Sequence, residues 1–161
     1  LVTKYDNLLV SRTMSKAFGL ANFRVGYLMA SRDNVQFINK IRNPKNLSTI
    51  AQEAACAALS GVPYMRAYVD EVHRGMQYFY EESKKYADHY TTHESHGNFI
   101  LLKFPTQEDK LALHKYLADN NIFARDTTQS PLVQNCFRIT IGTVEQMKRV
   151  MNVIDQYYKN K

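Results

Sequence analysis

The residues best suited to chemistry lie in the segment "SRTMSKAFGLANFR", where one lysine stands among hydroxyl groups and a glycine. Thr13 and Ser15 lie just before Lys16, and Arg24 follows eight residues after it. A neutral lysine amine forms an imine with a carbonyl, and hydroxyl and guanidinium groups are donors that suit a phosphate dianion. These two capacities match the aldehyde and the phosphate of pyridoxal phosphate. A lysine in a loop is more often a solvated charge, so the motif alone leaves both interpretations open.

A second candidate pair, Arg125 and Arg138, lies thirteen residues apart in "RDTTQSPLVQNCFR". An arginine in an apolar strand such as "CFRITI" usually faces outward into solvent, which is the plain structural interpretation of Arg138. The order of strand, polar loop and strand can also bring both side chains to one end of a sheet. There they would suit the carboxylate or phosphate of a small molecule.

Strands must hold the lysine segment in place. We expect a short buried strand at residues 7–12 and a second strand at residues 24–31, because both are apolar runs of strand length. The irregular loop between them would present polar groups at the edge of a core.

Three helices are expected to follow. Asp33 is available as a cap for the first, and Ser48 or Thr49 for the second, which Gly61 ends. Pro63 stands near the start of a long amphipathic helix. The expected helices cover residues 31–43, 46–61 and 63–90.

Beyond residue 90 the pattern changes to shorter elements. Strands separated by helices argue for a small α/β sandwich, so the predicted fold class is α/β. The boundary between the two parts is expected inside the long helix, which divides the chain into residues 1–65 and 66–161. The expected strands cover residues 98–104, 122–125 and 136–142, and the expected helices cover residues 106–121 and 143–160.

The segment from Asn7 to Ser31 resembles the cofactor-lysine segment of the fold-type I aminotransferases, and most closely that of the histidinol-phosphate aminotransferase family. The resemblance implies that Lys16, in the "SKAFGL" run, carries pyridoxal 5'-phosphate and is the catalytic residue. It also implies that Thr13, Ser15 and Arg24 hold the cofactor phosphate.

The segment "IFARDTTQSPLVQNCFRITIGT" is similar to the two-arginine segment of the same family. By this resemblance, Arg138 grips the α-carboxylate of the amino donor, and Arg125 helps to receive the phosphate or carboxylate tail of the other substrate. Asn98, in "HGNFILL", matches a further family position on the substrate-binding side.

The resemblance implies the C-terminal portion of an aminotransferase. Residues 1–65 would be the end of the large cofactor-binding domain, and residues 66–161 the small C-terminal domain. The implied reaction transfers an amino group between a histidinol-phosphate-like substrate and a 2-oxo acid, 2-oxoglutarate with glutamate. The resemblance also implies histidine biosynthesis and a homodimer in the complete enzyme. A cytoplasmic location is expected for a different reason, since no apolar run has the length of a membrane span and the first residues lack the order of a signal peptide.

We expect the chain alone to be inactive, since the family's ring-stacking aromatic residue and its aspartate beside the pyridine nitrogen are not assigned in it. Two alternatives stay open. Related phosphothreonine decarboxylases share the architecture, which makes a decarboxylase of a phosphorylated amino acid possible. The chain could also be a non-catalytic α/β dimerisation module.

Composition and charge bear on other function classes. The net charge of +6 raises nucleic acid as a partner, but the basic residues are scattered among acids, so no nucleic-acid partner is expected. No apolar run has the length of a membrane span, so no membrane partner is expected. His89, His93 and His96 lack a carboxylate or thiolate cluster, and no metal is expected there. Cys56 and Cys136 stand in apolar surroundings and are expected to be buried free thiols.

Overall fold

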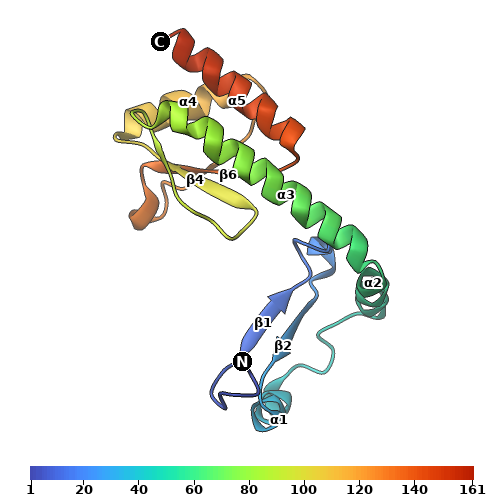
Figure 1. Ribbon diagram of the computed structural model, residues 1–161. Helices are drawn as coiled ribbons and strands as arrows, with labels where there is room; N and C mark the ends of the chain where they lie inside the picture. The colour runs from blue at the N-terminus through green and yellow to red at the C-terminus, as the bar shows by residue number, and fades with distance from the viewer. The chain divides into compact units, whose positions relative to one another are not determined.

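Two compact units make up the chain in the computed structural model, which describes residues 1–161 (Figure 1). The first unit is Leu1–Tyr68 and the second is Val69–Lys161, so the break lies inside the long helix α3 (Val62–Ser83). The assignment of the two units to a large and a small domain stays a prediction. None of the helices combines the length and the apolar composition that crossing a membrane requires.

The first unit contains an antiparallel ribbon of two strands, β1 (Val10–Thr13) and β2 (Gly26–Met29). Gly26 lies opposite Thr13, and a Cβ atom at Gly26 would come within 2.8 Å of the Arg12 carbonyl oxygen, so the strands approach closely there. The expectation of a buried first strand is wrong, because three of the four β1 residues and all of β2 are exposed. The small core of this unit lies instead in the loop beyond the ribbon, where Met14 and Val25 pack with Ala51.

Helices α1 (Arg32–Ile41) and α2 (Thr49–Ser60) follow the ribbon. The expected cap of α1 is wrong, since the Ser31 hydroxyl accepts the hydrogen bond from the Asn34 N–H at 3.4 Å. Asp33 lies in the first turn, where its negative charge favours the helix dipole. Ser48 caps α2, as expected.

The two cysteines differ from each other. Cys136 is buried, as expected, but Cys56 is exposed on α2, where Ala51 is the single fully buried residue. The apolar neighbours of Cys56 in the sequence therefore did not indicate burial, because α2 carries alanines on its exposed side, such as Ala57, as well as on its packed side, such as Ala51.

An antiparallel sheet of four strands, in the order β3-β4-β6-β5, forms the frame of the second unit. The two edge strands are only two residues long each, and the first of them was not expected from the sequence. The strands are β3 (Thr91–Thr92), β4 (Phe99–Lys103), β5 (Arg125–Asp126) and β6 (Cys136–Thr140).

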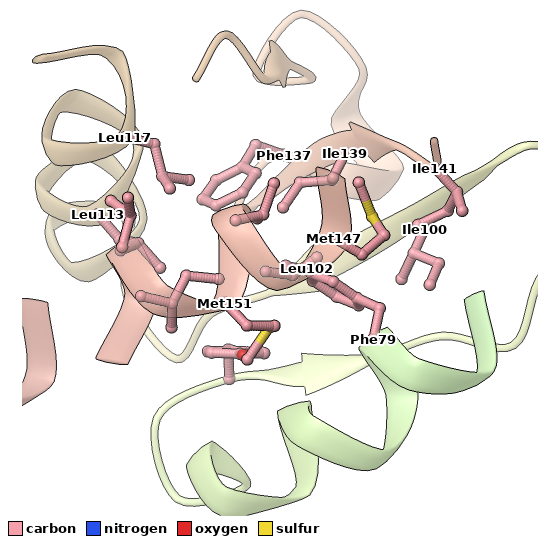
Figure 2. Packing of buried hydrophobic residues seen from close by; sticks show 14 of the residues in the cluster. Phe79, Ile100, Leu102, Leu113, Leu117, Phe137, Ile139, Ile141, Met147 and Met151 are labelled. Carbon is pink, nitrogen blue, oxygen red and sulfur yellow. The ribbon is translucent and has the colours of Figure 1, made fainter. Parts of the chain in front are cut away.

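Three helices pack on one face of this sheet. Helix α3 ends at Ser83 and passes into a short 3-10 turn, well before the expected end at residue 90. Helices α4 (Gln107–Asp119) and α5 (Val144–Lys159) each begin at a threonine cap. Figure 2 shows the core between the helices and the sheet, which includes Phe79, Ile100, Leu102, Leu113, Leu117, Phe137, Ile139 and Met151.

Strand alternation places a different set of side chains on the other face. Phe99 and Leu101 on β4 and Arg138 on β6 share this face and are half-buried, while Thr140 is exposed. The helices therefore cover the face of Ile100 and leave the arginine-bearing face open.

Candidate functional site

The lysine segment forms a closed turn directly after β1. The Met14 N–H donates to the Val25 carbonyl at 3.1 Å, and the Leu20 N–H donates to the Met14 carbonyl at 3.0 Å. The Met14 side chain is only 2% exposed, so it anchors the turn in the small core. The next two residues are displayed instead, with Ser15 half-buried and Lys16 exposed.

The hydroxyl groups of Thr13 and Ser15 lie side by side. Thr13 Oγ1 donates to Ser15 Oγ at 2.8 Å and accepts from the Ser15 backbone N–H at 3.1 Å. The Thr13 hydroxyl proton is thereby used within the pair. The Ser15 hydroxyl keeps its own proton and can donate it to an anion.

Arg24 has a left-handed backbone, with φ of 55°. This conformation is costly for a residue with a Cβ atom, and such strain is concentrated at functional sites. Arg24 Nη1 donates to the Ala21 carbonyl at 3.0 Å, which leaves other guanidinium donors free. The Met14–Val25 bond follows the last pair of the ribbon, Thr13 with Gly26, so Ser15 and Arg24 each lie one residue beyond this bond in the sequence.

A cavity of about 530 Å³ opens beside the lysine within the first unit. Its lining is mainly apolar, and Lys16 is the charged residue among the residues that line it. The other lining residues are Ala17, Phe18, Gly19, Ala58, Gly61, Tyr64, Met65 and Tyr68. The turn thus places an amine at the rim of a space with aromatic walls.

The arginine pair belongs to the second unit. Arg125 on β5 lies directly opposite Arg138 on β6. Residues in such a cross-strand pair share one face of the sheet, and like charges there destabilise the pairing. An anion bound between the two guanidinium groups would remove that repulsion.

Arg138 is oriented by its neighbours. Its guanidinium carbon lies 4.9 Å from the centre of the Phe99 ring, a cation–π contact that fixes the plane of the group. Its Nε atom is buried and has no hydrogen-bond partner. A buried donor without an acceptor is unfavourable, so a ligand oxygen at this position would be stabilising.

Asn98 precedes β4 and extends its pairing, since its backbone carbonyl accepts from the Ile141 N–H at 2.9 Å. By strand alternation, Asn98 belongs to the same face of the sheet as Ile100 and not to the face of Phe99. The structure therefore brings Arg125 and Arg138 together in register and does not place Asn98 in their cross-strand pair.

Two residues beside the arginine pair were not identified from the sequence. Asp126, next to Arg125, accepts a hydrogen bond at 2.7 Å from Nζ of the fully buried Lys110. This bond, together with bonds from Thr128, holds the pKa of Asp126 below its usual range. The "RD" dipeptide was a signal for Asp126. Lys110 stands at helical spacing from Leu113 and Leu117, but its charge is typical of an exposed position, so its burial was not expected.

Comparison with known proteins finds relatives along the whole chain. A family model described as aminotransferase class I and II matches residues 1–154. A dihydroxyacetone phosphate transaminase from Campylobacter jejuni is 38% identical, over 100% of this chain and 43% of that protein. A histidinol-phosphate aminotransferase from Ruminiclostridium cellulolyticum is 36% identical, over 99% of this chain and 44% of that protein. The chain spans less than half the length of these curated relatives.

Solved structures share the fold. Histidinol-phosphate aminotransferase from Clostridium acetobutylicum matches 99% of this chain and 48% of its own, with a TM-score of 0.84 and 21% identity. The enzyme of that name from Sinorhizobium meliloti, in complex with pyridoxal-5'-phosphate, matches 96% and 42%, with a TM-score of 0.78 and 25% identity. L-threonine-O-3-phosphate decarboxylase from Porphyromonas gingivalis matches 98% and 49%, with a TM-score of 0.74 and 21% identity. These similarities confirm the predicted fold class.

Proposed function

Because this chain belongs to the aminotransferase class I and II family, we propose that it serves pyridoxal-phosphate-dependent transamination, with Lys16 as the residue that binds the cofactor covalently. The observation that carries the proposal is the closed turn after β1, which displays Lys16 beside two paired hydroxyl groups and the rim of a cavity.

The donor set of this turn fits a phosphate group. Ser15 has a hydroxyl proton to give, and Arg24 has guanidinium donors beyond the one that the Ala21 carbonyl accepts. Charge-assisted hydrogen bonds of this kind suit a dianion. Thr13 acts mainly by orienting the Ser15 hydroxyl, so we assign it to the phosphate site through that contact.

The residues of this chain have separate tasks in the proposed reaction. When bound, pyridoxal phosphate is an electron sink for the pair left on the substrate Cα atom. Lys16 Nζ, once free, would accept the proton from that Cα atom and give it to the former aldehyde carbon of the cofactor, which is the 1,3-shift of transamination. Arg138 binds the substrate α-carboxylate, while Arg125 receives a phosphate or carboxylate tail. Asn98 is kept as a weaker substrate-side candidate.

The proposed substrates are an amino acid or amino phosphate resembling histidinol phosphate, and 2-oxoglutarate with glutamate. Two of the relatives carry a phosphorylated compound in their names, which supports an anionic tail. The two opposed arginines offer two positive charges for such groups. Histidine biosynthesis, a cytoplasmic location and a homodimeric complete enzyme are part of the same proposal, as is the assignment of residues 1–65 and 66–161 to its two domains.

The test uses the protein made from its complete reading frame and saturated with pyridoxal phosphate. Borohydride reduction followed by peptide mapping should find the pyridoxyl group on Lys16. Lys4 and Lys40, which are exposed in the same unit, are the matched controls and should stay unmodified. An unmodified Lys16 in folded, saturated protein would end the proposal.

A decarboxylase of a phosphorylated amino acid is the alternative reaction. The structural similarity to L-threonine-O-3-phosphate decarboxylase shows only a shared fold, but it makes the comparison worthwhile. Carbon dioxide release and 2-oxo acid formation should both be measured, with phosphorylated amino acids as the substrates. Carbon dioxide without an oxo acid would favour decarboxylation, and the reverse result would favour transamination.

A further inference from the structure

Lys110 is the one charged residue that is fully buried in the chain. It lies on α4 in the same helical series as the core residues Leu113 and Leu117. Its Nζ atom donates to Asp126 Oδ1 at 2.7 Å and to Thr128 Oγ1 at 2.5 Å. A buried ammonium is costly even when paired, and an apolar side chain of similar volume often serves stability equally well. Stability alone therefore does not account for this lysine.

The strand that Lys110 contacts has a weakly defined register. β5 contains only Arg125 and Asp126 and lies at the edge of the sheet. Arg125 pairs with Arg138, and Asp126 pairs with Phe137. A shift by one residue would move Asp126 to the face of Arg138 and turn Arg125 away, because successive side chains alternate between faces.

Charge favours the shifted register at this edge. Two arginines opposite each other repel, whereas an aspartate opposite an arginine attracts. In the shifted register the Asp126 carboxylate would pair with Arg138 and occupy the position that an anionic substrate needs. Some interaction on the helix side must therefore hold Asp126 in place.

We propose that Lys110 is a positioning residue, whose buried pair with Asp126 locks β5 in the register that keeps Arg125 opposite Arg138. The inference rests on the proposed function insofar as the two arginines receive substrate anions. Asp126 is 44% exposed at its side chain while Lys110 is 0% exposed, so the ammonium is the buried member of the pair. Removing Lys110 leaves a carboxylate that water can still solvate, and the unit should fold without it.

A neutral anchor in the same loop offers a matched control. The Thr127 hydroxyl lies 2.8 Å from the Val133 carbonyl oxygen and 2.7 Å from that of Cys136, so it fixes the loop that follows β5 without using charge. If Lys110 acted only by ordering this loop, Thr127→Val would have the same effect as Lys110→Met. If it acts by holding Asp126, the two variants should differ.

The experiment measures the KM for 2-oxoglutarate in the complete protein loaded with pyridoxal phosphate. Lys110→Met should raise the KM by at least about tenfold, the effect of losing one charge-assisted hydrogen bond to an anion, with kcat changed by less than about threefold. The double variant Lys110→Met/Asp126→Asn should recover part of the loss, since no carboxylate remains to pair with Arg138, while Arg125 is still not held opposite Arg138. Thr127→Val should keep a KM near that of the unmodified protein.

Three outcomes would overturn the inference: an unchanged KM in Lys110→Met, no recovery in the double variant, or an equal rise in Thr127→Val. Absence of cofactor on Lys16 in the unmodified protein would count against the proposed function instead. The register can then still be read from a crystal structure of Lys110→Met. Arg125 opposite Arg138 in that structure would refute the lock, and Asp126 in that place would support it.

Discussion

Replacing Arg24 separates what its backbone does from what its side chain does. Its φ of 55° penalises any residue with a Cβ atom by about 1 kcal/mol relative to glycine. Both Arg24→Ala and Arg24→Gly lose the bond to the Ala21 carbonyl, but only Arg24→Gly relieves the backbone. Arg24→Gly should therefore unfold with a free energy about 1 kcal/mol higher than that of Arg24→Ala.

Affinity for pyridoxal phosphate should not follow this order. Both variants lack the guanidinium, and the loss of a hydrogen bond to a charged group costs about 1.5 to 3 kcal/mol, or about 10- to 150-fold in Kd. The two Kd values should agree within about threefold, because both variants lose the same contact.

Denaturant unfolding and titration of pyridoxal phosphate, followed by absorbance, give the two quantities. Arg12 is the matched control, since it is exposed on the same ribbon and precedes Thr13, so it points to the other face. Arg12→Ala should leave the Kd unchanged. Recovery of affinity in Arg24→Gly over Arg24→Ala, or a normal Kd in both, would refute a phosphate contact by Arg24.

Three further predictions concern stability. Gly75→Ala should lower the free energy of unfolding, measured in denaturant, by about 1 to 3 kcal/mol, because the added Cβ atom would come within 2.6 Å of the Gly142 carbonyl oxygen. Helix propensity alone favours alanine over glycine and predicts the opposite change. A more stable variant would contradict the prediction. Met14→Ala should lower the free energy of unfolding by about 2 kcal/mol, because it leaves a cavity in the small core. Met29→Ala, at an exposed position, should change the free energy of unfolding by less than about 0.5 kcal/mol. Equal losses would show that Met14 does not anchor the turn. The pKa of Asp126 is below its usual range in the folded protein, so the ionised carboxylate stabilises the fold above pH about 4, and this stabilisation is lost as the pH falls below that value. The difference in free energy of unfolding between the unmodified protein and Asp126→Asn should therefore shrink in acid. A difference that grows in acid would refute this prediction.

The sequence predicted the elements whose signals are local. Ser48 and Gly61 bound α2 as expected, since caps and stop residues act within a few positions of the helix end. Asp33 failed as a cap because Ser31 offers a hydroxyl two positions earlier, and both residue types are good caps. A local rule could not choose between them.

The site was predictable to the extent that its chemistry lies in residue types. The hydroxyl pair, the lysine and the arginines could be named from their spacing and family pattern. The contact of Arg138 with Phe99 could not, because it depends on the register between β4 and β6, which joins residues far apart in the chain. Lys110 was missed for a similar reason, since its burial depends on the position of β5 across from α4.

The "RD" dipeptide acquires a physical meaning from strand alternation. Arg125 and Asp126 are neighbours in sequence, yet they serve opposite faces of the sheet, one toward Arg138 and the other toward Lys110. A two-residue edge strand has too few backbone bonds to fix its own register, so the side chain on one face must hold the side chain on the other. The pairing of two like charges on the open face is then sustained by an ion pair on the helix face. A substitution at Asp126 is consequently expected to act on anion binding through Arg125, without contact between the substituted side chain and the anion.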